Sequence, residues 1–276
     1  MKPRLTSAFF LMLFLFTWLF FTGEVLFTII SIGVIAWTLF EFFSAVKRCK
    51  AYRPFATIGI IGGVLIMSYQ ALLELVPDIS DQTNQCIALV LFMIFASEIF
   101  RKEKQDSIAN IALTVFGVFF LAFLGSYMIK IRFLPHARLW ILFLFVVAKM
   151  NDVGAYVIGS RFGRVKLAKY ISPKKTVEGA VGGVLIGVLS GLGLWLVLDE
   201  YHTFIGLTGV IGLSFILGII GQLGDLFESL LKRDLKIKDF GHFIPGFGGV
   251  LDLLDSLYFA TPALYLYVTE VMRLNK

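Results

Sequence analysis

Residues 232–256 read KRDLKIKDFGHFIPGFGGVLDLLDS: a cluster of charges, a turn rich in glycine, and the start of an apolar run that carries Asp252 and Asp255. Apolar runs lie on both sides of this segment, and each is long enough to cross a bilayer, which takes about 20 residues. The segment therefore connects two predicted membrane spans. Carboxylates at membrane depth are costly unless a partner or a cavity accommodates them, so the two acids indicate a functional site.

The composition of the whole chain indicates an integral membrane protein. Of its 276 residues, 58% are hydrophobic and 16% are charged, and the mean hydropathy is +0.86. A soluble domain of this size carries more charge. Two cysteines, Cys49 and Cys86, are too few for a disulfide framework and lack metal-ligand spacing. The net charge of +6 suits an anionic membrane surface or a phosphorylated substrate and does not distinguish them.

We predict an all-α fold, a polytopic membrane bundle of about nine transmembrane helices. The first apolar run follows basic residues without a small-residue cleavage site, and we interpret it as a retained helix. Basic loops alternate with acidic or neutral ones, which places the N-terminus and the basic loops in the cytoplasm and the C-terminus outside. The predicted spans are residues 6–22, 25–45, 54–76, 85–100, 108–129, 137–158, 178–200, 203–231 and 250–271.

Polarity is uneven along the chain, which predicts two functional regions. The first five spans consist mostly of Phe, Leu, Ile and Val, and residues 1–135 are interpreted as a transmembrane scaffold. Charges enter the later spans and the basic loops lengthen. Residues 136–276 are therefore predicted to form a catalytic transmembrane region whose polar site faces the cytoplasm.

Two of the later spans carry polar side chains at helical spacing. Lys149, Asp152 and Tyr156 lie three and four residues apart, so they share one helix face. They form either one wall of a polar site or an ion pair that neutralises itself. A second face is formed by Gln222, Asp225, Ser229 and Lys232. Solvation could explain its cytoplasmic end, but it explains Asp225 poorly, about two turns deeper in an apolar helix.

The glycine-rich turn and the acids after it predict a site for a cation and a phosphate. Gly248 and Gly249 allow a backbone or a phosphate to approach closely. The N-terminus of the following helix favours an anion. Carboxylates beside an anion site require a cation between them, and hard oxygen ligands with phosphate suit Mg²⁺. Asp225 and Asp252 are the candidate metal pair. The alternative, that Asp252 only caps its own helix, leaves Asp225 unexplained.

Basic segments supply candidate phosphate ligands. The clamp nearest the acids consists of Lys232, Arg233 and Lys238. The loop that contains SPKKT, residues 172–176, is predicted to be a second anion-binding turn. A topology signal or contact with acidic lipid is the alternative for the preceding basic residues Arg161, Arg164, Lys166 and Lys169.

These motifs together resemble those of the phosphatidate cytidylyltransferases, also called CDP-diacylglycerol synthases. Residues 151–183, NDVGAYVIGSRFGRVKLAKYISPKKTVEGAVGG, are similar to the family's D-T-G-A-Y and S-P-x-K-T-x-E-G-x-x-G-G segment, and GQLGDLFESLLKR fits its G-D-x-x-x-S-x-x-K-R. The family signature continues with K-D, P-G-H-G-G and D-R-x-D. It is matched by Ser229, Lys232, Arg233, Lys238, Asp239, Pro245, Gly246, Gly248, Gly249, Asp252 and Asp255.

The resemblance implies an enzyme that makes CDP-diacylglycerol and pyrophosphate from CTP and phosphatidate. It places Mg²⁺ on Asp225 and Asp252, adds a monovalent cation such as K⁺, and implies a homodimer in a bacterial inner membrane, without a nucleic-acid partner. Catalytic roles are expected for Asp225, Asp252, Lys232, Arg233 and Lys238. Substrate-binding or supporting roles are expected for Asp152, Ser172, Lys175, Thr176, Ser229, Asp239, Gly248, Gly249 and Asp255.

The chain departs from the family pattern at two positions. Phe247 replaces the histidine of P-G-H-G-G, and Leu253 replaces the arginine after the metal-binding aspartate. Either His242 and Lys236 substitute, or the substrate differs, or activity is lower. The alternatives are therefore a related CTP-dependent enzyme, such as a polyprenol kinase or an archaeol-type cytidylyltransferase, and a lipid or ion transporter. A transporter is expected to show paired inverted repeats, which the sequence lacks.

Overall fold

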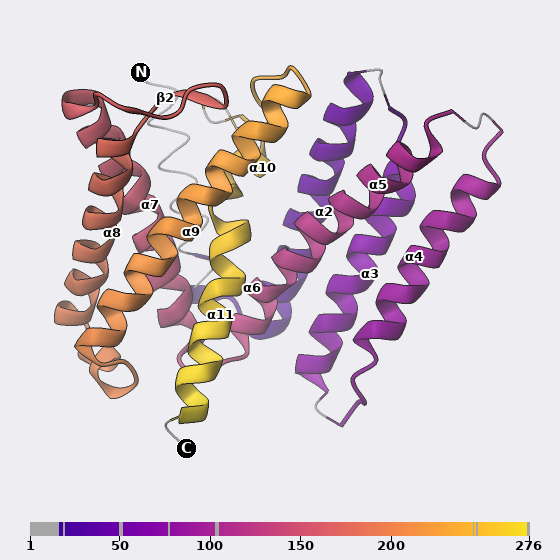
Figure 1. The fold of residues 1–276 in the computed structure, drawn as a ribbon. Helices are drawn as coiled ribbons and strands as arrows, with labels where there is room; N and C mark the ends of the chain where they lie inside the picture. The colour runs from indigo at the N-terminus through magenta and orange to yellow at the C-terminus, as the bar shows by residue number, and fades with distance from the viewer. Residues whose placement is uncertain are drawn as a thin grey trace. The chain divides into compact units, whose positions relative to one another are not determined.

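A computed structural model describes residues 17, 18, 20–49, 52–76, 78–102, 105–244, 246 and 248–274, with side chains up to residue 270. The regular structure is almost entirely helical, as predicted (Figure 1). The helices are α2 (Glu24–Arg48), α3 (Ala56–Leu75), α4 (Thr83–Ile99), α5 (Ser107–Gly117), the π-helix η1 (Val118–Phe123), α6 (Leu124–Arg132), α7 (Ala137–Phe162), α8 (Val177–Val197), the 3₁₀-helix η2 (Asp199–Thr203), α9 (Leu207–Asp234), α10 (Val250–Leu254) and α11 (Leu257–Leu274). The strands are β1 (Lys166–Ala168) and β2 (Ser172–Thr176).

Six helices among the described residues are long and apolar enough to cross a membrane. They are α2, α3, the continuous helix Ser107–Arg132, α7, α8 and α9. The chain is therefore an integral membrane protein, while the predicted count of about nine is not confirmed. Helix α4 is apolar but shorter. Most of the predicted span 6–22 lies outside the described residues.

The predicted span 250–271 is wrong as a continuous helix. Helix α10 ends at Leu254, and α11 begins at Leu257. The Asp255 carboxylate accepts a hydrogen bond from the backbone N–H of Ser256, at 2.6 Å. Such local side-chain hydrogen bonds compete with those of the helix, which explains why a uniformly apolar run breaks at this aspartate.

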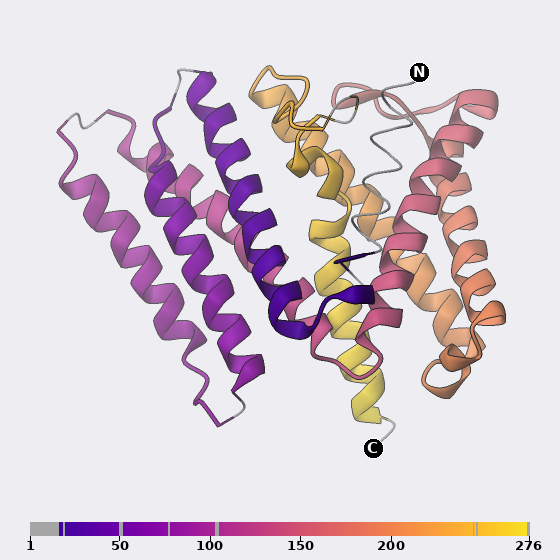
Figure 2. The same ribbon diagram turned by 180° about the vertical axis from the view of Figure 1, so that it is seen from behind.

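The chain forms two compact units. The first contains the residues up to Leu134 together with Asp234–Leu254, and the second contains Pro135–Arg233 and the residues from Asp255 onward. This division into compact units does not test the predicted division at residue 135 between a scaffold and a catalytic region, which stays a prediction. In the first unit, α3 lies between α2 and α4 (Figure 2) and also contacts η1 and α6. The first unit also includes α10, which packs against α2.

In the second unit, glycines on α8 bring this helix against α7. A Cβ on Gly182 would lie 2.8 Å from Cβ of Ile158, and one on Gly183 would lie 2.6 Å from Oδ1 of Asn151. Small residues at helix interfaces in membranes allow such close approach. The packing fixes the position of the polar residues on α7 relative to α8.

The basic loop after α7 contains a β-hairpin, and residues 172–176, where the sequence predicted a turn, form strand β2. Strands β1 and β2 are antiparallel, with Lys166 opposite Thr176. The Glu178 carboxylate accepts N–H groups of Arg164 and Val165, at 3.0 and 3.2 Å. The Oγ1 of Thr176 accepts the N–H of Gly179 and caps α8. These bonds fix the hairpin to the start of α8.

Candidate active site

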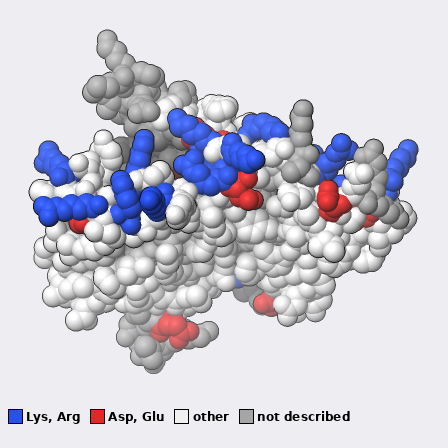
Figure 3. Space-filling model, turned by 45° about the horizontal axis from the view of Figure 1, so that its top comes forward, with Lys and Arg blue, Asp and Glu red and all other residues white. Residues whose placement is uncertain are grey.

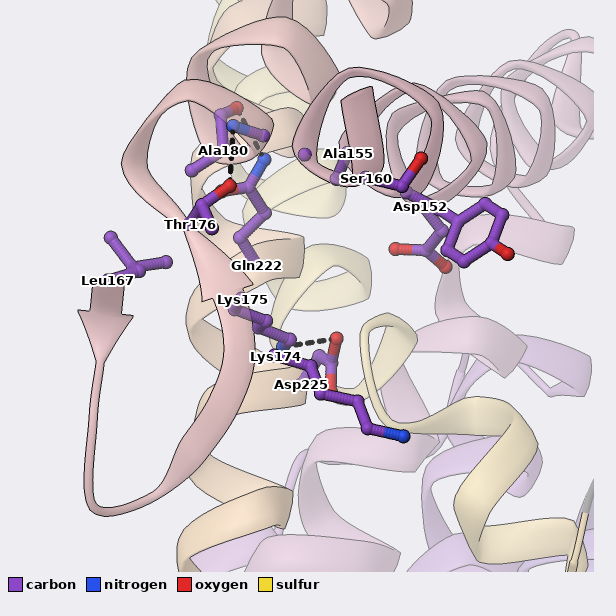
Figure 4. Close-up of a pocket in the computed structure, with 13 residues that line it drawn as sticks. Asp152, Ala155, Ser160, Leu167, Lys174, Lys175, Thr176, Ala180, Gln222 and Asp225 are labelled. Atoms are coloured by element: carbon purple, nitrogen blue, oxygen red, sulfur yellow. Dashed lines mark hydrogen bonds and ion pairs between the residues drawn. The ribbon is translucent and has the colours of Figure 1, made fainter. Parts of the chain in front are cut away.

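A pocket of about 400 Å³ lies in the second unit, between α7, the hairpin, α8 and α9 (Figure 4). Acidic, basic and hydroxyl groups meet in it. The polar residues in its lining are Asp152, Tyr156, Ser160, Lys174, Lys175, Thr176, Gln222 and Asp225. The two faces predicted from helical spacing, on α7 and α9, therefore both contribute to this pocket.

Two hydrogen-bonded amides, Asn151 and Gln222, fix the pocket wall behind the acids. Gln222 Nε2 donates to Oδ1 of Asn151 at 2.8 Å and to the carbonyl of Ala180 at 2.9 Å. Asn151 Nδ2 donates to the carbonyl of Gly218 at 2.9 Å. The network links α7, α8 and α9 next to Asp152. Sequence reasoning missed Asn151, although an amide beside an acid within an apolar run was a usable signal.

Each of the two acids in the pocket pairs with a lysine. Lys175 on β2 forms an ion pair with Asp225 on α9, drawn as a dashed line in Figure 4. Lys149 lies 3.6 Å from Asp152 within α7, so the self-neutralising pair considered from the sequence exists. Asp152 nevertheless lines the pocket. The alternatives of ion pair and polar wall are therefore both present.

Asp225 belongs to a cluster of three carboxylates with Glu228 and Asp255, hereafter the carboxylate cluster. One ligand oxygen from each lies within 4.8 Å of the others. Glu228 is fully buried, and Nζ of Lys232 lies 2.6 Å from its carboxylate. Buried carboxylates need positive charge nearby, and the lysines supply it here. Three hard oxygen ligands in one place fit a small divalent cation such as Mg²⁺.

Glu228 was not among the residues selected from the sequence. It lies three residues after Asp225 on α9, so helical spacing could have identified it. Asp255 joins the cluster because its backbone comes close to α9 at a glycine. A Cβ on Gly224 would lie 2.8 Å from the carbonyl oxygen of Asp255.

Asp252 belongs to the first unit, where it is fixed by backbone donors. Its Oδ2 accepts the N–H groups of Phe240 and Gly249, each at 2.9 Å. The bond to Gly249 runs back to the start of α10, so Asp252 also has the helix-capping role considered as the alternative. The metal pair of Asp225 with Asp252 stays a prediction.

Glycines occupy the left-handed positions of the turn before α10. Gly246 and Gly248 have φ values of 87° and 98°, which side chains rarely adopt. The backbones of Gly248 and Ile244 form a bridge with N–H to carbonyl distances of 2.8 and 3.1 Å. Pro245 and Phe247, which the sequence analysis also singled out, lie outside the described residues.

The other predicted residues are divided between the units. Arg233 donates through Nε to the carbonyl of Ile171 at 3.0 Å, next to Ser172 at the start of β2. Ser229 lies half-buried on α9. Lys238 is exposed and Asp239 is half-buried, both in the first unit. Their contacts with a substrate stay predictions.

Basic side chains surround the hairpin of the second unit. In Figure 3 lysine and arginine side chains (blue) gather over the end of this unit that carries the hairpin. Exposed members of this set are Arg161, Arg164, Lys166, Lys169, Lys174 and Arg233. A positive surface at this end attracts anionic ligands.

Comparison with known proteins identifies the family. The family model described as "Cytidylyltransferase family" matches residues 2–271. A protein named phosphatidate cytidylyltransferase from Bacillus subtilis is 33% identical over 271 residues, which are 96% of each chain. One with the same name from Synechocystis sp. is 32% identical over 261 residues, 84% of each chain. The resemblance stated from the motifs is thereby confirmed, and the chain belongs to the cytidylyltransferase family.

Proposed function

We propose that this protein is a phosphatidate cytidylyltransferase, which makes CDP-diacylglycerol and pyrophosphate from CTP and phosphatidate. The observation that carries the proposal is the pocket itself. It brings Asp225 together with Lys175 and Thr176, residues from two separate motifs of the family, in one polar cavity of a membrane protein. Relatives that carry this name match across most of the chain.

The reaction joins two anions, which defines what the residues must do. An oxygen of the phosphatidate phosphate attacks the α-phosphorus of CTP and forms a new P–O bond. The bond between the α-phosphorus and the bridging oxygen breaks, and pyrophosphate leaves with the electron pair. The nucleophile is already ionised, so positioning and charge neutralisation replace a strong general base. Lys175, Lys232 and Arg233 are proposed to bind the phosphates.

The carboxylate cluster supplies ligands that fit Mg²⁺, with Asp252 as the further ligand expected from the motif. A bound divalent cation would neutralise phosphate charge. Lys175 and Lys232 form ion pairs with Asp225 and Glu228. With a divalent cation held by these acids, the two ammonium groups would pair with substrate phosphates instead. The proposal also includes a monovalent cation such as K⁺ and a homodimer. It locates the protein in the inner membrane, with the site facing the cytoplasm.

Pyrophosphate release tests the reaction. Detergent-purified protein is given CTP, phosphatidate and Mg²⁺, and the Asp225→Ala variant is measured beside it. We expect release from the wild type and loss of at least about 100-fold in the variant. Formation of CDP and a phosphorylated polyprenol instead would assign a kinase. Lipid or ion transport in proteoliposomes without nucleotide turnover would overturn the enzymatic proposal.

A further inference from the structure

A buried acid in α2 contacts the turn that carries Asp252. Glu41 is 5% exposed and lies in the region that the sequence assigns to the scaffold. Its Oε1 accepts the N–H of Val250 at 3.1 Å, and its Oε2 accepts the N–H of Leu251 at 2.9 Å. Nε1 of Trp37 donates to Oε1 at 3.0 Å and orients the carboxylate. All of these residues belong to the first unit.

These contacts cap α10 from outside. The first N–H groups of a helix need acceptors, and the residue before the first turn normally supplies a side-chain oxygen. Here that residue is Gly249, which has no side chain. Asp252, at the third helical position, reaches back to the N–H of Gly249 at 2.9 Å. This is the back-bond of a capping box. Glu41, more than 200 positions away in the sequence, accepts the N–H groups of the first two helical residues, Val250 and Leu251.

The glycines of the turn are shaped to receive this carboxylate. A Cβ on Gly249 would lie 2.5 Å from Oε2 of Glu41, and one on Gly241 would meet the same carboxylate. The N–H groups of Gly249, Val250 and Leu251 are therefore donated within the chain. Gly249 makes room for Glu41 in this structure, where the sequence analysis expected a phosphate.

We infer that Glu41 is a positioning residue for the reaction. It holds the turn of residues 248–252, hereafter the signature turn, so that the Asp252 carboxylate keeps one orientation. The inference rests on the proposed function, because it takes Asp252 to act on the bound cation and substrates. It adds a residue of α2, outside the matched motifs, to the residues that support the reaction.

Hydrogen exchange of the full-length protein in detergent, without substrates, tests the contact directly. Glu41→Ala removes both acceptors, and Glu41→Gln keeps the size but offers an N–H₂ group to one of the two donors. We expect amide exchange in a peptide covering 248–254 to become about tenfold faster in Glu41→Ala, from the loss of a helix cap. Glu98→Gln is the matched control, because Glu98 is a buried acid of the same unit that pairs with Arg101.

Kinetics then separate positioning from stability. In the pyrophosphate assay, both Glu41 variants are expected to lose at least about tenfold in kcat and to need more Mg²⁺ for half-maximal activity, with KM for CTP changed less. A cap that serves stability alone lowers the thermal midpoint and leaves these values unchanged at temperatures where the variant is folded. Glu98→Gln should leave exchange at 248–254 and the Mg²⁺ requirement unchanged.

A second substitution guards against misfolding and tests the geometry. Serine is a strong N-cap residue, so Gly249→Ser in the Glu41→Ala background should restore slow exchange at 248–254. Gly249→Ser alone should speed this exchange, because its Cβ has no room beside Glu41. The two results together are expected only if Glu41 both caps α10 and lies against Gly249.

Two outcomes overturn the inference. One is unchanged exchange at 248–254 in both Glu41 variants. The other is faster exchange with wild-type kcat and wild-type Mg²⁺ requirement. If the wild type releases no pyrophosphate from CTP and phosphatidate, the proposed function fails, and the role of Glu41 in positioning Asp252 for that reaction fails with it. The exchange data would in that case still decide whether Glu41 holds the signature turn.

Discussion

Replacing Asp255 with asparagine should make the protein more stable in the absence of Mg²⁺. It should also remove most of the stabilisation that Mg²⁺ provides. Ligand oxygens of the carboxylate cluster lie within 4.8 Å of one another. Two like charges at that distance repel by about 3.5 kcal/mol at an effective dielectric constant of 20. Asp255 takes part in two of the three pairs, each no longer than 4.8 Å, so at this dielectric constant its charge costs at least about 7 kcal/mol, part of which Lys175 and Lys232 offset. Asparagine keeps an oxygen to accept the N–H of Ser256.

The measurement is the thermal midpoint in detergent, in EDTA and in excess Mg²⁺. In the wild type, Mg²⁺ at about 100 times its Kd contributes about 2.7 kcal/mol, or roughly 5–10 °C. In Asp255→Asn we expect a midpoint several degrees higher in EDTA and a gain from Mg²⁺ below about 2 °C. Asp199→Asn is the matched control, because Asp199 is an exposed acid of the same unit outside the cluster.

The reasoning is refuted if Asp255→Asn has the wild-type midpoint in EDTA and gains as much from Mg²⁺ as the wild type does. That result would mean that Asp255 neither repels the other two acids nor helps to bind the cation. An equal effect of Asp199→Asn would show that total charge matters and the cluster does not.

Three further predictions concern turnover and packing. Asp252→Asn should abolish pyrophosphate release while circular dichroism stays unchanged, since asparagine keeps an acceptor for the backbone donors; full activity would remove its metal role. Lys175→Met should lower kcat/KM for CTP at least about tenfold in the same assay, because a cation in the pocket is lost; an unchanged kcat/KM would exclude a phosphate contact. Gly183→Ala should lower stability by about 1–3 kcal/mol, since its Cβ would lie 2.6 Å from Oδ1 of Asn151. Gly193→Ala, with nothing within 4 Å, should be neutral or stabilising by up to about 1 kcal/mol, and equal thermal shifts in the two would contradict the packing.

Features that depend on residues close together in the sequence could be predicted from the sequence. Hydrophobic length identified the six long apolar helices, and helical spacing placed Asp152 and Asp225 on polar faces that both line the pocket. The sequence also predicted a glycine-rich turn before Asp252, and two glycines of this turn, Gly246 and Gly248, have positive φ in the structure. These predictions succeeded because the relevant forces act within one helix or one turn.

The hairpin and the break at Asp255 were not predicted, because neither follows from hydrophobic periodicity or from hydropathy. The segment from Lys166 to Thr176 has neither a regular alternation nor enough apolar residues to indicate strands. Its pairing is held in place by Glu178 on the next helix. At residues 254–257, hydropathy predicts a continuing span, while the hydrogen bond from Ser256 to the Asp255 side chain ends the helix.

The sequence by itself determined that this is a membrane protein of the cytidylyltransferase family and which segments carry its acids and cations. Only the tertiary structure decided the partners of those groups. Lys175 meets Asp225, Glu228 and Asp255 join the carboxylate cluster, and Glu41 caps a helix 209 positions further along the chain. The physical reason is that a buried charge is stabilised by whichever group folding brings within a few ångströms, and periodicity along one helix contains no information about contacts between helices.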